Sequence, residues 1–172
     1  MIFEKTNASR RVNGITFLVL STAHLINDMY ANFLQQLIPF LIAGNILSVT
    51  AAASLVSAFT ITSSVMQPIF GYLVDQKGQR WLLYVGTLWM SVLLGTTGYV
   101  HNYFILIIIT ALAGMGTGAF HPQAAGTIGQ IESSHKGLIL GAFVAAGNMG
   151  MSISPLILIP LFNKYGVGST WL

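Results

Sequence analysis

Residues 14–42 read GITFLVLSTAHLINDMYANFLQQLIPFLI, an apolar stretch long enough to cross a lipid bilayer as a helix. Such a crossing takes about 20 predominantly apolar residues. Asp28 is the only acidic residue inside any such stretch, because Glu4, Asp75 and Glu132 all lie in polar gaps. A carboxylate at the centre of a bilayer costs about 2.5–3.5 kcal/mol, so it usually has a partner or a function. Asp28 is therefore the first candidate functional residue.

The composition of the whole chain indicates that lipid is its main solvent. Of its 172 residues, 54% are hydrophobic and only 6% are charged, and the mean hydropathy is +0.74. Soluble domains carry about 25% charged residues. The net charge of +3 is too small to indicate a nucleic-acid partner. Cysteine is absent, which excludes disulfides and cysteine-based metal or redox sites.

Five apolar segments have the length of a membrane helix, and short polar gaps separate them. They cover about residues 14–42, 50–74, 81–99, 103–128 and 138–162. Trp171-Leu172 then reads as the start of a sixth helix. The expected fold class is all-α, an integral membrane helical bundle that forms one transmembrane domain over residues 1–172. The first segment is too long for a signal-peptide core, so we expect it to be retained.

The distribution of basic residues predicts the orientation of the bundle in the membrane. Lysine and arginine are enriched in cytoplasmic loops. If the helices alternate in direction, one side of the membrane collects Lys5, Arg10, Arg11, Lys77, Arg80 and Lys136, and only Lys164 falls on the other side. We therefore expect a multi-pass protein of the plasma (inner) membrane with a cytoplasmic N-terminus.

The first segment has a polar face that contains an ionisable pair. His24, Asn27, Asp28 and Gln35 share this face at helical spacing, and His24 lies one turn before Asp28. One interpretation is a buried hydrogen-bond cluster that joins this helix to its neighbours. The other is a proton or substrate site that lines a cavity. The sequence leaves both open.

Other polar and small residues are spread over the later segments. We expect Gln67 to line a cavity, and Gly114 and Gly118 to form a small-residue packing pair. His121 shares the face of these glycines, and the adjacent Pro122 should kink or break the helix. One face of the last segment holds Gly141, Asn148 and Pro155, and a second, small face holds Gly147, Gly150 and Ser154.

The stretch from Gly71 to Arg80, GYLVDQKGQR, lies in the gap between the second and third segments. It resembles the conserved loop of the major facilitator superfamily, which Gly71, Asp75, Gly78 and Arg80 match. Gln76 and Trp81 depart from that pattern, where the family has basic residues. The resemblance implies that this stretch gates the cytoplasmic side during conformational switching.

A closer resemblance rests on three strings, His24-Leu-Ile-Asn-Asp-Met-Tyr30, Gly118-Ala-Phe-His-Pro122 and Gly147-Asn-Met-Gly150. Together they look like the fosmidomycin-resistance family within that superfamily. Members have twelve helices, so the resemblance implies that this chain is the N-terminal half of a transporter. Two positions depart from related proteins: Thr110 stands where an arginine is common, and Gln123 where an acid is common.

The resemblance implies proton-coupled efflux (antiport) of a small drug-like or anionic molecule, with a substrate site between two halves. Asp28 would carry the proton and His24 would tune it. The cavity would be lined by Asn27, Gln35, Gln67, His121 and Asn148. The implied partners are the lipid bilayer, the substrate, protons and the C-terminal half, without which we expect no transport.

Three alternatives remain beside efflux. The first is an uptake symporter or facilitator of the same fold, and the second is a non-transporting membrane fragment that packs with a partner. The third is an enzyme, for which His24, Asp28 and His121 offer the only metal-ligand set we identify. Because the 71–80 loop favours transport, we expect no enzyme activity, no metal and no cofactor.

Overall fold

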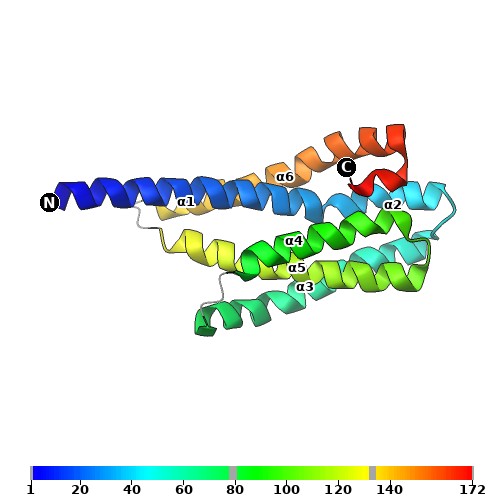
Figure 1. The fold of residues 1–172 in the computed structure, drawn as a ribbon, viewed down its shortest axis with the longest axis horizontal. Coiled ribbons are helices and arrows are strands. Elements are labelled where there is room, and N and C mark those ends of the chain that lie inside the picture. Colours follow the sequence, from blue (N-terminus) through cyan, green and yellow to red (C-terminus); the bar gives the residue numbers. More distant parts are fainter. Residues whose placement is uncertain (1, 78–80, 132–134, 172) are drawn as a thin grey trace.

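The computed structural model describes residues 2–77, 81–131 and 135–171, and it confirms the all-α fold class. Figure 1 shows an elongated bundle whose long helices run roughly along one axis. In chain order the elements are α1 (Ile2–Ala31), α2 (Phe33–Ala43), α3 (Val49–Lys77), α4 (Leu82–Thr96), the 3₁₀ turn η1 (Thr97–Tyr99), α5 (Tyr103–Gly129), α6 (Lys136–Tyr165) and the 3₁₀ turn η2 (Val167–Trp171).

The first expected helix is interrupted at Asn32, and its N-terminal part is longer than predicted. Helix α1 begins at Ile2 rather than Gly14, and α2 follows it after the single residue Asn32. The Asn32 side chain donates a hydrogen bond to the backbone carbonyl of Met151 at 2.9 Å. Asparagine side chains compete with helical backbone bonding, which makes this residue a natural place for the interruption.

The remaining helices lie close to the expected segments, with two differences. Pro122 lies inside α5, which continues to Gly129, so the proline does not end the helix. The short 3₁₀ turn η2 includes Trp171, where the sequence predicts the start of a sixth helix. Leu172 lies outside the described residues.

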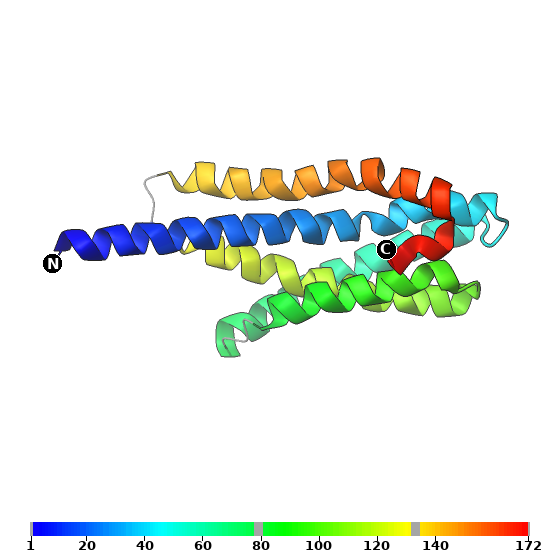
Figure 2. The ribbon, with the colours of Figure 1, turned by 45° about the horizontal axis from the view of Figure 1, so that its top comes forward.

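Helix α5 lies at the centre of the packing. It packs along both α3 and α4 and also touches α1 and α6, while α1 packs against α6. Figure 2 shows α6 and α1 side by side, with α5 beneath them.

Glycines permit the closest contacts between α5 and its neighbouring helices. A Cβ on Gly86 of α4 would lie 2.6 Å from the carbonyl oxygen of Gly116 in α5, so neither position has room for a side chain.

Two clusters of buried apolar side chains fill the bundle. One cluster includes Leu20, Leu83, Phe120, Ala124, Ile128, Ile131 and Phe143. The other includes Phe33, Leu34, Leu37, Leu41, Leu55, Phe59, Met90, Leu94, Leu106 and Phe162. Along α1 and α2, His24 and Asp28 fall between Leu20 of the first cluster and Phe33 of the second. The polar pair is thus placed between two apolar layers.

The outer surface fits a lipid environment. Among the described residues, four helical segments are long and apolar enough to cross a membrane: Val49–Gln76, Leu82–Tyr99, Tyr103–Gly129 and Lys136–Tyr165. Helix α1 is not in that set, because His24, Asn27 and Asp28 lower its hydropathy. Large apolar side chains point outward, with Phe104 72% and Leu156 75% exposed. A soluble protein rarely exposes so many, so these faces are suited to lipid or to further helices.

Candidate functional site

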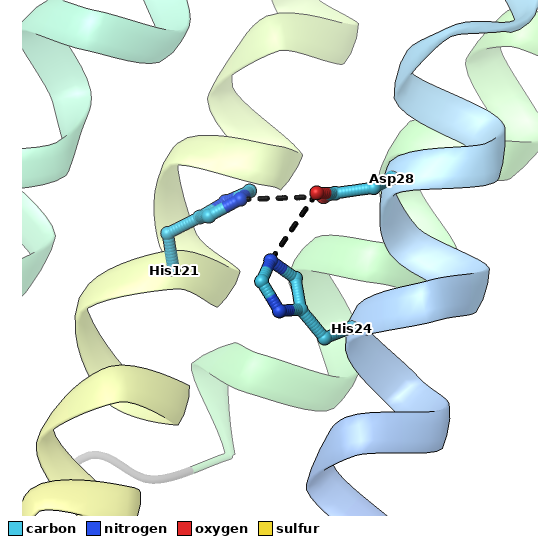
Figure 3. Close-up of side chains that lie close together, drawn as sticks. All are labelled: His24, Asp28 and His121. Atoms are coloured by element: carbon cyan, nitrogen blue, oxygen red, sulfur yellow. Dashed lines mark ion pairs between the residues drawn. The ribbon is translucent and has the colours of Figure 1, made fainter. Parts of the chain in front are cut away.

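Two helices bring three ionisable side chains together inside the bundle (Figure 3). Helix α1 carries His24 and Asp28 one turn apart, and His24 Nε2 lies 3.2 Å from Asp28 Oδ2. Helix α5 brings His121 to the same carboxylate, with Nε2 lying 3.3 Å from Oδ1. We call His24, Asp28 and His121 the triad. Each carboxylate oxygen therefore faces one histidine nitrogen.

The second ring nitrogen of each histidine is bound to the protein backbone. His24 Nδ1 lies 2.9 Å from the carbonyl oxygen of Phe143 in α6, and His121 Nδ1 lies 2.9 Å from that of Thr117 in α5. A carbonyl oxygen can only accept a hydrogen bond, so Nδ1 is the donor in both histidines. The Nε2 atom of a neutral imidazole with this tautomer carries a lone pair and no proton.

This arrangement turns the triad into a site for positive charge. With both histidines neutral and Asp28 ionised, two Nε2 lone pairs would face a negative carboxylate without any proton between them. One added proton, on Nε2 or on Asp28, turns one contact into a hydrogen bond, and a second proton satisfies the other. The side chains of His24 and Asp28 are only 7% and 5% exposed, so water offers them little compensation.

Asn27 connects the triad to α5 and to one further helix, α4. Its amide donates hydrogen bonds to Asp28 Oδ1 at 3.1 Å and to Thr117 Oγ1 of α5 at 3.0 Å. Its carbonyl oxygen accepts a weaker bond from Thr87 of α4 at 3.4 Å. Because Asn27 is completely buried, it positions the carboxylate rather than contacting open space.

Helix α6 seals the His24 side of the triad. The Phe143 ring stacks on the His24 ring at 4.2 Å, and Phe120 lies 5.8 Å away on another side. A Cβ at Gly147 would lie 2.5 Å from Asp28 Oδ2 and 2.6 Å from His24 Nε2, so only glycine fits there. The His121 side chain is 31% exposed, which makes it the open side of the triad.

The other residues expected in a substrate cavity differ from the triad in how exposed they are. Gln35 in α2 and Asn148 in α6 are exposed, and Gln67 in α3 is half-buried. A cavity of about 530 Å³ lies elsewhere, among α1, α3, α4 and α5. Its lining includes Asp75 and Gln123 but none of the five residues expected to line a substrate cavity.

The expected gating loop is only partly described. Gly71 lies in ordinary contact distance of Pro122, since a Cβ there would be 3.5 Å from the proline Cβ. Asp75 is exposed near the end of α3. Gly78 and Arg80 lie outside the described residues.

The residues expected to pack or kink helices differ in their surroundings. A Cβ on Gly114 would collide with the carbonyl of Phe59, and one on Gly118 would lie 2.9 Å from that of Ser63, so both let α5 approach α3 closely. Gly150 leaves no space beside the Leu25 carbonyl of α1. Gly141 is different, because a Cβ there meets nothing within 4 Å among the described residues. Pro155 lies half-buried within α6.

Several features of the site are not visible in the sequence. The contact of His121 with Asp28 and the acceptor role of the Phe143 carbonyl depend on how α1, α5 and α6 pack. Gly147 belongs to a small-residue face that the sequence does show, but its contact with the triad requires the structure. The metal-ligand alternative drawn from the sequence already groups His121 with His24 and Asp28, but it does not predict which atoms meet.

Sequence comparisons identify relatives of the chain. The profile of the Major Facilitator Superfamily matches residues 19–172. The fosmidomycin resistance protein of Escherichia coli (strain K12) is 29% identical over 153 residues, which are 87% of this chain and 37% of that protein. A probable L-galactonate transporter of the same organism is 26% identical over 96% of this chain and 37% of its own length. The multidrug resistance protein MdtG of Rahnella sp. (strain Y9602) is 33% identical over 63% of this chain and 27% of its own length.

These comparisons bear out the resemblance inferred from the three sequence strings, which match the fosmidomycin-resistance family. The chain spans little more than a third of the length of the curated relatives that it matches over most of its own length.

Proposed function

The chain belongs to the major facilitator superfamily, and from that premise we propose that it serves as the N-terminal helical half of a proton-coupled exporter. The substrate would be a small drug-like or anionic molecule. Transporters of this kind bind substrate between two halves near the middle of the membrane, and the halves rock around that site. The chain alone would not transport, because it supplies only one wall of the site.

One observation carries this proposal: a buried carboxylate in a membrane helix contacts the Nε2 atoms of two histidines. An ionisable residue within a membrane helix is costly and usually marks an ion or proton pathway. Asp28 would carry the proton, His24 would stabilise the loaded form from the sealed side, and His121 would face the cavity. Protonation of the triad and its release would then favour different arrangements of the two halves.

We assign the substrate wall to Gln35, Gln67, His121 and Asn148, with Gln35 and Asn148 reaching toward the second half. Asn27, which the sequence also predicts there, is completely buried and would instead hold the Asp28 carboxylate in place. The exposure of Gln35 and Asn148 supports this, since a wall of a shared cavity is open when one half is viewed alone. The stretch containing Gly71, Asp75, Gly78 and Arg80 would gate the cytoplasmic side. The contact between Gly71 and Pro122 supports a link from that stretch to α5.

Uptake of a small metabolite is the second candidate function. The similarity to a probable L-galactonate transporter, which matches 96% of this chain, supports a small metabolite as the substrate. The names of the fosmidomycin resistance protein and the multidrug resistance protein favour export. Export and uptake share the fold and the triad, so the direction of flux has to be measured.

Export predicts that cells expressing the full-length protein accumulate less of its substrate. A panel of drug-like and anionic compounds should include at least one whose intracellular level falls, and a protonophore should restore that level. The matched control is a strain carrying the empty vector. If compounds instead accumulate to higher levels in a proton-dependent way, uptake replaces export as the function. If no compound in the panel responds to the protonophore, proton coupling is contradicted.

We also propose that the N-terminus is cytoplasmic and that the protein lies in the inner membrane. The chain contains no cysteine, so single cysteines can report which side of the membrane each connection faces. Ala43→Cys and His101→Cys are expected to react with a membrane-impermeant thiol reagent in spheroplasts. Gln76→Cys should react only after the membrane is permeabilised. All three positions are exposed, so a reversed labelling pattern would invert the proposed orientation.

A further inference from the structure

We propose that His24, Asp28 and His121 form a binding site for a divalent transition-metal ion such as Zn²⁺. The inference rests on the geometry of the three side chains rather than on the transport role. The metal is an alternative occupant of the site and not a resident cofactor.

The spacing of the three side chains is close to that of a metal coordination shell. Ligands that lie about 2.0–2.1 Å from Zn²⁺ at the corners of a tetrahedron are about 3.3 Å apart. The two contacts within the triad measure 3.2 Å and 3.3 Å. One ligand atom from each residue can be chosen so that all three atoms lie within 4.8 Å of one another. The two contacts use different carboxylate oxygens, so both imidazoles have to shift inward to bind the same ion.

The hydrogen bonds around the triad are those that metal-ligating histidines use. Such a histidine almost always donates its other ring nitrogen to a carbonyl or carboxylate, which fixes the tautomer and aims the lone pair. His24 does this with the Phe143 carbonyl and His121 with the Thr117 carbonyl. Asn27 holds the carboxylate through Asp28 Oδ1. Both Nε2 lone pairs are therefore already aimed at the carboxylate, as Figure 3 shows.

The donor set selects the class of metal. Two imidazoles and one carboxylate suit Zn²⁺, Co²⁺, Ni²⁺ or Fe²⁺, whereas Mg²⁺ and Ca²⁺ prefer shells made mainly of oxygen. Three protein ligands leave at least one coordination position for water or another small ligand. An ion would enter past His121, whose side chain is 31% exposed, because α6 covers His24.

The protein offers few competing ligands. Four histidines and four acidic residues are present in the whole sequence, and cysteine is absent. Within the described ranges, which exclude residues 78–80 and 132–134, the triad is the one cluster of three or more such residues with metal-binding spacing. The described part of the chain is therefore expected to bind one ion, at the triad.

Cobalt is the direct probe, because Co²⁺ absorbs visible light according to its coordination geometry. The full-length protein, purified in detergent through a tag without histidine, should bind Co²⁺ at the triad and show bands of a four- or five-coordinate ion. Added Zn²⁺ should bleach these bands, and Mg²⁺ or Ca²⁺ should leave them unchanged. A six-coordinate spectrum that matches aqueous Co²⁺, or bleaching by Mg²⁺, would overturn the proposal.

Three matched variants locate the ion. His24→Gln and His121→Gln should each weaken Co²⁺ binding at least about 100-fold, since loss of even an outer-shell partner costs 10–100-fold. His101→Gln, at an exposed histidine outside the triad, should bind like the wild type. Thermal unfolding of each variant without metal checks that it is folded. Of the two triad variants, His121→Gln is the one less expected to disturb folding, because the His121 side chain is more exposed than that of His24. Unchanged binding in a folded His121→Gln protein would contradict the assignment.

Discussion

Asp28→Asn is expected to abolish proton-driven transport by the full-length protein while leaving substrate exchange intact. Asparagine has nearly the same shape as aspartate, and its amide can donate to a neutral Nε2 of His24 or His121. The packing of α1 against α5 and α6 should therefore survive. The substitution removes the carboxylate that gains and releases the proton, so a proton gradient no longer drives substrate movement.

Proteoliposomes separate these two activities. With a compound identified in the accumulation assay, the wild-type protein should show both gradient-driven flux and exchange of labelled for unlabelled substrate. The Asp28→Asn protein should lose gradient-driven flux by at least about 100-fold, the size expected when a coupling group contributes about 2.7 kcal/mol or more. Glu4→Gln is the matched acid-to-amide control, because Glu4 lies in the polar N-terminal segment, and it should retain both activities.

Gly150→Ala is expected to cause the largest loss of stability among single-methyl additions to α6. An added Cβ would overlap the Leu25 carbonyl of α1, and backbone atoms cannot move aside as a flexible side chain can. Overpacking usually costs about 1–3 kcal/mol, and a backbone collision should fall at the upper end. Three α1–α6 bonds would also stretch: Asn32 to Met151, Ser154 to Met29, and His24 to Phe143.

Gly141→Ala is the control in the same helix, since its added methyl meets no described atom within 4 Å. Alanine favours a helix over glycine by up to about 1 kcal/mol, so this variant should be as stable as the wild type or slightly more stable. The measurement is the thermal unfolding midpoint of the full-length protein in detergent. Equal midpoints for Gly150→Ala and Gly141→Ala would show that α1 and α6 do not meet at Gly150.

The helical bundle could be predicted from the sequence because its signal is local. Each membrane helix is an uninterrupted apolar run of sufficient length, so helices such as α3 and α5 lie near their predicted bounds. The interruption at Asn32 could not be predicted in this way. It accompanies a hydrogen bond from Asn32 to Met151, a residue of another helix far along the chain.

The candidate site also has one part that the sequence predicts and another that only the structure shows. The His24–Asp28 pair is set by helical geometry alone, and the prediction that these two side chains meet is confirmed at 3.2 Å. The contact of His121 with Asp28 depends on the packing of α5 against α1, which spacing along the sequence does not encode. The same holds for Gly147, whose missing side chain makes room for Asp28 and His24.

The central claim is that Asp28, held between two histidines, moves a proton against the substrate. The most direct measurement traps a pH-sensitive dye inside proteoliposomes and imposes a substrate gradient with no initial pH gradient. Antiport predicts that the wild-type protein changes the lumen pH in the direction opposite to substrate movement, and that Asp28→Asn moves substrate by exchange without changing the pH. A lumen pH change of the same size in the Asp28→Asn protein would contradict the claim.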